Sequence, residues 1–275
     1  MIFYHKNKIN QTKNAPFFFL IKYFYSPKIF PALLTFLFWL LTTFLVKCII
    51  LFMITDLHSH TNVSACGHDD VKTLIETAVK NGVDALGICD HHYGIGLDKL
   101  GYFNNLTKMQ KLYQDKIKII RGIEIATVER LRLDDGDDVS FFDYCLVEHI
   151  DYPDTVAKDF INYAKNLKTK VGIAHTDLFK YIKEKGFDDE KYLTALKDAG
   201  IFWELNVCYD SIHRFREHAY VKEFMNSKEQ QALVKKVGLE VSIGLDCHLA
   251  AEYDGARVKA ACEFLEINGI KTPKF

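Results

Sequence analysis

The sequence predicts an α/β fold in which seven parallel strands close into a barrel with helices packed around it. From Met53 onward, short apolar segments alternate with amphipathic segments, and this alternation is typical of βαβ units with a parallel sheet. Seven strands in a unit of about 220 residues favour a closed barrel over an open sheet. Six of the strands end on a histidine or an acid, as expected where the carboxyl ends of barrel strands meet at one site.

The predicted strands are short apolar runs of the length expected for buried strands. In chain order they cover residues 53–57, 83–89, 117–125, 142–147, 170–174, 201–205 and 239–245. The helices predicted between them cover residues 70–81, 105–114, 155–167, 189–199, 217–237 and 255–268. The first helix has an acidic start, apolar residues at helical spacing and Gly82 as its stop. Gly200 and Gly238 end two later helices in the same way, and the polar segment 130–138 is predicted as a loop.

The charge distribution divides the chain near residue 52. The whole chain has 35 basic and 36 acidic residues, and residues 1–52 contain six lysines but no arginine, aspartate or glutamate. The other 223 residues therefore carry 29 basic and 36 acidic groups. This balance argues against a nucleic-acid partner, which would require a basic patch. Bound metal could supply the positive charge that an anionic substrate needs.

Residues 1–52 are predicted to be a hydrophobic extension, separate from the unit formed by residues 53–275. The apolar run 30–46 continues after Lys47, and its length allows a transmembrane helix near residues 30–52. The run leads into the first strand without a linker, which argues against an anchor. A mis-assigned start, with the natural protein beginning at Met53, is the second interpretation. The protein is expected to be cytoplasmic, or single-pass membrane-anchored if the extension is an anchor.

The seven cysteines include no C-x-x-C pair. Cys89 and Cys145 lie in apolar runs, and most of the cysteines are predicted to be buried free thiols in a reducing compartment. Cys66 and Cys247 lie close in sequence to the candidate metal ligands, so either could be an additional soft ligand.

The candidate ligands lie where the predicted strands end. Because side chains alternate along a strand, His58 and His60 point the same way, and two adjacent imidazoles form half of a transition-metal site. The strand-end set comprises His58, His60, His91, Glu124, His149, His175, Asp246 and His248. Asp56 is predicted to support an imidazole N–H. Histidine and carboxylate ligands suit zinc, manganese or iron.

These motifs resemble the PHP (polymerase and histidinol phosphatase) superfamily of metal-dependent phosphoesterases. The matching segments are Asp56-Leu-His58-Ser-His60-Thr61, Cys89-Asp90-His91, Gly122-Ile-Glu124, Phe142-Asp-Tyr with His149, Ala174-His175 and Asp246-Cys-His248. They cover nearly all of residues 53–250 in the family's order. The resemblance implies that residues 53–275 form a PHP phosphoesterase domain with a distorted (β/α)7 TIM-like barrel.

The resemblance also implies two to three divalent metal ions. The first would be held by His58, His60, Glu124 and Asp246; Glu124 would bridge to a second held by His149 and His175; His68, His91 and His248 would hold a third. Two departures from the common pattern are Leu245-Asp-Cys-His, where Ser-Asp-small-His is usual, and the spacing from His60 to His68. Glu124, Asp246 and His248 are the expected catalytic residues.

The expected activity is hydrolysis of a phosphate monoester by a metal-activated water. Asn206, Lys180, Arg130 and Arg132 are candidates for substrate contact. Segments 175–180 and 204–206 resemble the histidinol-phosphatase branch, which makes histidinol phosphate the expected substrate, although Asp177 and Lys180 could equally be a helix cap and a solvated charge. A nucleotide or another small phosphorylated metabolite is the alternative. A metal-dependent amidohydrolase is less favoured, because no lysine occupies a strand end.

Overall fold

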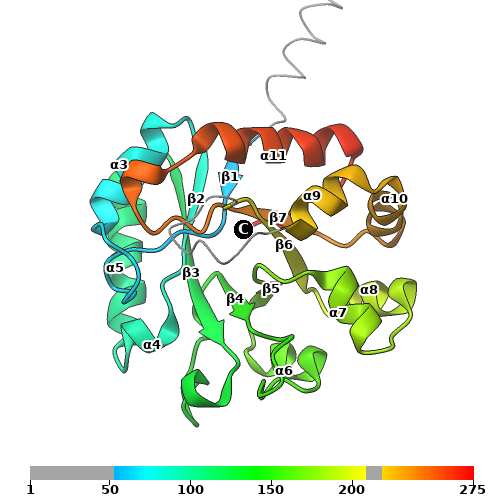
Figure 1. Ribbon diagram of the computed structural model, residues 1–275. Helices are drawn as coiled ribbons and strands as arrows, with labels where there is room; N and C mark the ends of the chain where they lie inside the picture. The colour runs from blue at the N-terminus through cyan, green and yellow to red at the C-terminus, as the bar shows by residue number, and fades with distance from the viewer. Residues whose placement is uncertain (1–52, 209–218) are drawn as a thin grey trace, which may run out of the picture. The chain divides into compact units, whose positions relative to one another are not determined.

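Seven parallel strands form the centre of the protein, which a computed structural model describes over residues 53–208 and 219–275 (Figure 1). The strands are β1 (Thr55–Asp56), β2 (Ala85–Ile88), β3 (Lys118–Ala126), β4 (Tyr144–Glu148), β5 (Lys170–Ile173), β6 (Phe202–Asn206) and β7 (Val241–Gly244). Neighbours in the sheet are neighbours in the chain, and every pair is parallel. The predicted α/β barrel is confirmed.

The first and last strands nearly close this barrel. The backbone N–H of Leu57 donates to the Ile243 carbonyl at 2.8 Å, and that of Asp246 donates to the His58 carbonyl at 2.6 Å. These bonds continue past the end of β1, which is shorter than the predicted strand 53–57. The residues that follow β1 are therefore held against the end of β7, at the carboxyl end of the barrel.

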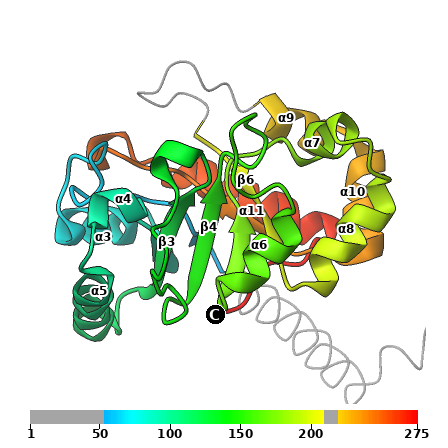
Figure 2. The ribbon, with the colours of Figure 1, turned by 90° about the horizontal axis from the view of Figure 1, so that it is seen from below.

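Helices surround the strands (Figures 1 and 2). They are α3 (Val71–Lys80), α4 (His92–Ile95), α5 (Lys99–Tyr113), α6 (Phe160–Asn166), α7 (Leu178–Glu184), α8 (Asp189–Asp198), α9 (Ala219–Asn226), α10 (Lys228–Val237) and α11 (Gly255–Asn268). Two 3-10 turns, η1 (Glu129–Leu131) and η2 (Ala250–Glu252), lie in loops. Helix α11 packs across β1 and β7, where the barrel closes.

Two helices differ from the predicted ranges for local hydrogen-bonding reasons. Helix α5 begins before the predicted residue 105, because the Asp98 carboxylate accepts the backbone N–H of Gly101 at 2.9 Å and caps the helix there. The predicted helix 217–237 is two helices, because the Ser227 hydroxyl accepts the N–H of Gln230 at 3.3 Å and starts α10. Helices α4 and α7 were not predicted.

The barrel interior is filled by Tyr144 and Phe202, both fully buried. Gly122 faces the Tyr144 ring so closely that a Cβ atom at position 122 would overlap it. The Tyr144 hydroxyl donates to the Leu57 carbonyl at 2.6 Å, one residue before the first candidate ligand. The Phe275 ring packs against Tyr144, with centroids 5.2 Å apart. The interior is thus a packed core that supports the strand ends.

Tyr144→Ala should lower the free energy of unfolding by about 3–5 kcal/mol, because the small side chain leaves a cavity in this core. Tyr144→Phe should cost only about 1 kcal/mol, because it removes a single hydrogen bond. Urea denaturation of both variants measures the difference. Equal costs for the two variants would mean that the hydroxyl, rather than the ring, stabilises the barrel.

No helix within the described residues is long and apolar enough to cross a membrane. Three predictions concern positions outside the described residues. They are the membrane helix near residues 30–52, the alternative of a mis-assigned start, and the beginning of the predicted helix at residue 217.

Candidate metal centre

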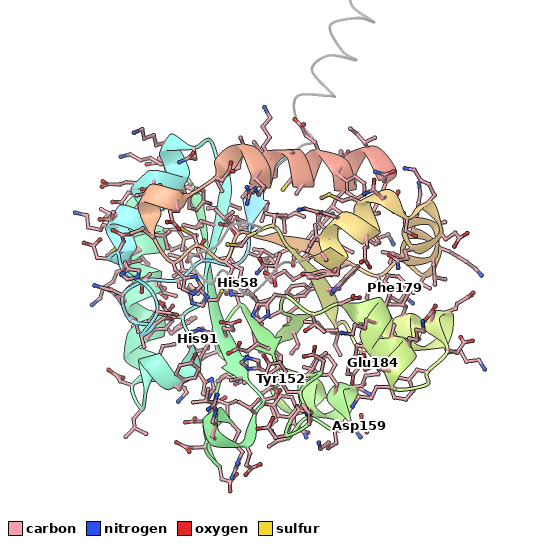
Figure 3. All side chains as sticks on the ribbon, in the orientation of Figure 1. His58, His91, Tyr152, Asp159, Phe179 and Glu184 are labelled. Carbon is pink, nitrogen blue, oxygen red and sulfur yellow. The ribbon has the colours of Figure 1, made fainter. Side chains whose placement is uncertain are left out.

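The histidines and acids predicted at strand ends gather at the carboxyl end of the barrel. His58 and His91 lie within the ring of helices (Figure 3). Glu124 lies in β3, and the other members of the set follow the ends of β1, β2, β4, β5 and β7. Three clusters of side chains in the described residues have donor atoms close enough to hold a metal ion. We call them the first group (His58, His60, Asp246), the second group (His91, Glu124, Glu148) and the cysteine group (His60, Cys66, His91, His248).

The three residues of the first group are buried. His58 Nε2 and His60 Nε2 lie 3.0 Å apart, and Asp246 Oδ1 lies 3.1 Å from His60 Nε2 and 3.5 Å from His58 Nε2. Burial opposes protonation, yet the carboxylates of Glu204, Asp246 and Glu124 hold the pKa of His58 well above its ordinary value. The three donor atoms therefore converge on a point where positive charge is stabilised.

Glu124 links the first and second groups. Its Oε1 lies 3.1 Å from His175 Nε2 and 3.4 Å from His58 Nε2, and its Oε2 lies 2.7 Å from His91 Nδ1 and 3.4 Å from His60 Nε2. Burial opposes ionisation, but the imidazoles of His91 and His58 hold the pKa of Glu124 well below its ordinary value. The geometry permits this carboxylate to share its two oxygens between adjacent metal positions.

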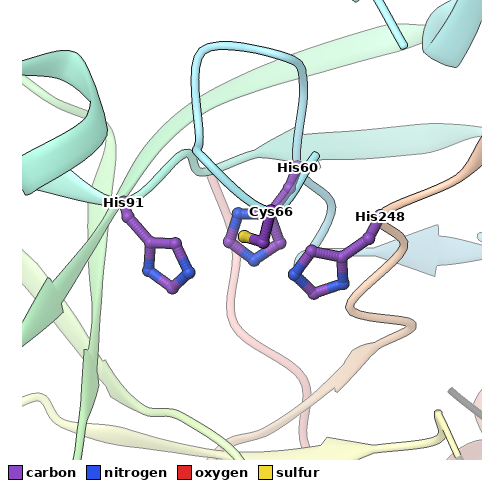
Figure 4. A group of neighbouring side chains, drawn as sticks. All are labelled: His60, Cys66, His91 and His248. Atoms are coloured by element: carbon purple, nitrogen blue, oxygen red, sulfur yellow. The ribbon is translucent and has the colours of Figure 1, made fainter. Parts of the chain in front are cut away.

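The cysteine group places a thiol among three imidazoles (Figure 4). The ring centroids of His60 and His248 lie 4.5 Å apart, and those of His60 and His91 lie 4.7 Å apart. Burial opposes ionisation of Cys66, but hydrogen bonds with His248 and His91 lower the pKa of its thiol to about 7. This group was not predicted as a unit, because Cys66 was only one of two possible soft ligands.

Buried atoms with unmet bonding capacity indicate that these residues fit metal ions. Within the described residues, His91 Nδ1, Glu124 Oε2 and Glu148 Oε1 are buried and have no hydrogen-bond partner, although His91 Nδ1 and Glu124 Oε2 are only 2.7 Å apart. Buried polar atoms are normally paired or coordinate a metal, so donor atoms that face a common point suit a divalent cation.

Three of the candidate ligands have strained backbones. His149, His175 and Asp246 have φ angles of 65°, 21° and 53°, in or near the left-handed region that non-glycine residues rarely adopt. Each residue directly follows a strand or lies two residues beyond one. Strain of this kind persists where the surrounding structure enforces it and is concentrated at functional sites. It turns these side chains away from the strict alternation of the strand.

Glu204 holds the imidazole of His58 in the first group, a supporting role that the sequence did not predict. It is fully buried in β6; its Oε1 lies 2.7 Å from His58 Nδ1, and its Oε2 accepts the backbone N–H of His175 at 2.6 Å. The prediction that Asp56 supports an imidazole was wrong. The Asp56 oxygens accept the backbone N–H groups of His58 and Leu245 instead, so Asp56 fixes the backbone and Glu204 fixes the imidazole.

Glu204→Gln should lower the affinity of the site for metal by about 10–100-fold, because a carboxylate that accepts the ligand's second N–H orients the ring and raises its basicity. The amide keeps the size of the side chain but removes the charge. Metal retention during dialysis against a graded chelator measures the change. Glu240→Gln is the matched control, since Glu240 forms its ion pair with Lys170 at 2.7 Å. Equal retention in both variants would contradict this role for Glu204.

Several predicted residues are not brought into the groups. His68 and Arg130 are exposed. The Lys180 side chain is 67% exposed and pairs with Glu184 at 3.8 Å, and Asp177 caps α7 by accepting the Lys180 N–H at 3.0 Å. Arg132 pairs with acids of its own loop. Asn206 differs from these: it is fully buried at the end of β6, and its side-chain nitrogen has no hydrogen-bond partner in the described structure.

Glu148 is a functional candidate that the sequence interpretation missed. Its Oε1 lies 3.4 Å from His91 Nδ1, and its Oε2 lies 3.1 Å from His149 Nε2 and 3.8 Å from His175 Nε2. Glu148 was overlooked because the adjacent His149 had been assigned as the strand-end residue. The sequence signal that could have identified Glu148 is its position as an acid directly after the apolar run 142–147.

A parallel barrel with three adjacent metal-competent groups at its carboxyl end is a scaffold that can support metal-dependent hydrolysis. The chain belongs to the PHP domain family, which matches residues 56–266, and the resemblance inferred from the motifs is confirmed.

The chain is similar to two known proteins, one in sequence and one in structure. A probable phosphatase of Clostridium acetobutylicum is 25% identical over 209 residues, which is 71% of this chain and 79% of the relative. The crystal structure of a histidinol phosphate phosphatase from Lactococcus lactis, complexed with zinc, L-histidinol and phosphate, is similar with 20% identity and a TM-score of 0.52. That match covers 79% of this chain and 94% of the Lactococcus chain, and at this identity it is a likeness of fold.

Proposed function

We propose that this PHP-family metal-dependent phosphatase hydrolyses the phosphate monoester of a small metabolite, with histidinol phosphate as its substrate. The observation that carries the proposal is that Glu124 joins the groups: its Oε1 lies 3.4 Å from His58 Nε2, and its Oε2 lies 2.7 Å from Nδ1 of His91, which also belongs to the cysteine group. The metal positions are therefore adjacent. A monoester presents three free phosphate oxygens to such a set, whereas a diester presents two, so the arrangement suits a terminal phosphate.

The proposed cofactors are two to three divalent metal ions, of which zinc, manganese and iron are the candidates. His58, His60, Asp246 and Glu124 would hold the first, and Glu124 would share the second with His149, His175 and Glu148. The metals would supply Lewis-acid polarisation of the phosphoryl oxygens and a water of lowered pKa as nucleophile.

The protein's own residues would orient the ligands and exclude bulk water. His248 Nδ1 lies 2.8 Å from the Asp246 carbonyl, which fixes the tautomer that has its lone pair on Nε2. Glu204 holds the His58 ring as described above. The side-chain N–H₂ of Asn206 remains a candidate donor to a substrate oxygen. With Glu124 and Asp246 buried, their negative charges act in a low-dielectric surrounding that strengthens their attraction for the cations they would hold.

Three observations support histidinol phosphate among the monoesters. Segments 175–180 and 204–206 resemble the histidinol-phosphatase branch. The Lactococcus enzyme with this fold contains histidinol and phosphate. The unit from residue 53 onward has 29 basic and 36 acidic residues, and this excess of negative charge would repel a monoester with a cationic amine less than one without it.

A substrate panel tests the proposal. The full-length protein, loaded with zinc or manganese, should hydrolyse histidinol phosphate with a kcat/KM at least about tenfold above that for nucleoside monophosphates, a difference of about 1.4 kcal/mol in transition-state stabilisation. An aryl phosphodiester should be slower still. Release of inorganic phosphate is the measurement. The Glu124→Gln variant, purified in parallel, controls for contaminating phosphatases.

Two outcomes would overturn parts of the proposal. If a nucleotide gives the highest kcat/KM, the substrate is wrong and the monoesterase activity stands. If the diester gives the highest value, the monoesterase assignment is wrong as well.

A further inference from the structure

Cys66 lies in the loop between β1 and α3, two residues before the predicted ligand His68. The thiol is half-buried and faces the imidazoles of His91 and His248 (Figure 4), whereas His68 is exposed. The backbone N–H of His68 donates to the His248 carbonyl at 2.9 Å. The loop is thus fastened beside His248 in a way that turns residue 66 inward and residue 68 outward.

Hydrogen bonds around Ser64 fix this loop rigidly. The Ser64 hydroxyl donates to the Asp90 carboxylate at 2.7 Å and accepts the backbone N–H of His91 at 2.9 Å. The turn passes so close to the Thr61 carbonyl at residue 67 that a Cβ atom there would overlap it, so this position requires glycine. Cys66 lies between these two fixed positions. Its place in the cysteine group is therefore built into the loop and does not depend on a flexible side chain.

Three of the four residues in the cysteine group are available to one metal ion: Cys66, His91 and His248. His60 Nε2 is directed to the first group, 3.0 Å from His58 Nε2 and 3.1 Å from Asp246 Oδ1. His91 Nδ1 lies 2.7 Å from Glu124 Oε2, on the side of the second group, which leaves Nε2 of the same ring for the cysteine group. With His60 committed elsewhere, the thiol of Cys66 and the imidazoles of His91 and His248 remain. Three protein donors with an open fourth position are the usual pattern of a catalytic zinc site.

We propose that the Cys66 thiolate is a metal ligand that forms, with His91 and His248, a site preferring zinc over manganese. Thiolate is a soft ligand that selects zinc, whereas carboxylate suits manganese. His68, the ligand expected from the sequence, takes no part in this site. The inference rests on the proposed function and deepens it, because it assigns the ligands of one metal position at the carboxyl end of the barrel. It predicts that this position and the other metal positions differ in the metal they prefer.

Cobalt spectroscopy of the full-length protein tests the ligand directly. The protein is stripped of metal and loaded with Co²⁺ alone, and its near-ultraviolet absorbance is recorded. The wild-type protein should show a thiolate-to-cobalt charge-transfer band that Cys66→Ser loses. Cys66→His should keep the cobalt equivalent without the band, which shows that the loop still folds. Cys262→Ser is the matched control, because Cys262 lies outside the three groups and its Sγ contacts the Thr55 carbonyl at 3.4 Å.

Competition between zinc and manganese tests the selectivity. The ratio of zinc to manganese retained should fall at least about tenfold in Cys66→Asp, which replaces the thiolate with a carboxylate. No band in cobalt-loaded wild-type protein, or a band that persists in Cys66→Ser, would overturn the ligand assignment. An unchanged retention ratio in Cys66→Asp would overturn the preference. If the protein shows a band that depends on Cys66 but hydrolyses no phosphate monoester, the ligand assignment holds and the proposed function is wrong. If it hydrolyses a monoester but shows no such band, the proposed function holds and the ligand assignment is wrong.

Discussion

Glu124→Gln should reduce kcat by a factor on the order of 10³ while leaving the barrel folded. The two carboxylate oxygens lie 2.7–3.4 Å from nitrogens of four histidines, so the amide removes one negative charge from two adjacent metal positions at once. Loss of a single preorganised electrostatic contact already costs about 10²–10³ in rate. Steady-state phosphate release under saturating metal is the measurement.

A matched substitution separates this effect from general damage. Glu184→Gln makes the same chemical change on the exposed face of α7, where Glu184 is 59% exposed (Figure 3), and should keep full activity. Circular dichroism should show native helix content for both variants. If Glu124→Gln retained near-normal turnover at saturating metal, the shared carboxylate would have to be sought elsewhere, and Glu148 would be the first alternative.

The strand ends could be predicted because two regularities coincide there. A strand alternates its side chains, so His58 and His60 share a face, and a parallel barrel brings all carboxyl ends together. These rules need no knowledge of tertiary contacts. They place Glu124 and Asp246 near the same histidines, and the structure brings those residues within 3.5 Å of His58.

The same rules fail where the backbone leaves the regular strand. Alternation sends adjacent side chains to opposite faces, so Glu148 and His149 were not expected at one site. The φ angle of 65° at His149 breaks the alternation, and both side chains reach the cluster, 3.1 Å apart. Glu204 could not be paired with His58 from the sequence, because the two are separated by 146 residues.

Loop geometry is the other limit of the sequence. Residue spacing alone does not distinguish Cys66 from His68 as the residue that faces the site. The turn closed by Gly67 decides it, and the hydrogen bonds of Ser64 hold that turn in place. The Ser64 hydrogen bonds join the loop to Asp90 and His91, beyond β2, so the choice of ligand depends on tertiary structure.

Metal removal should abolish hydrolysis and also destabilise the fold. Buried acids at the barrel mouth (Glu124, Glu148, Glu204 and Asp246) pair only with histidines in the described residues, and no lysine or arginine there neutralises them. Without metal, these carboxylates are offset only by imidazoles that must stay protonated in a buried site, which is costly, whereas bound cations would offset them in the folded state alone. At metal concentrations a thousandfold above Kd, such binding stabilises a protein by about 4 kcal/mol.

Calorimetry of the full-length protein before and after chelation measures this effect. For a domain of this size, about 4 kcal/mol corresponds to a fall in Tm of about 10 °C. Chelator saturated with zinc beforehand is the control, and it should change neither Tm nor activity. Adding zinc back should restore both together, because the same ligands stabilise the barrel mouth and support hydrolysis. A protein shown to be metal-free by elemental analysis that kept its Tm and its activity would contradict the metal centre itself, since its buried carboxylates would then be stable without any cation.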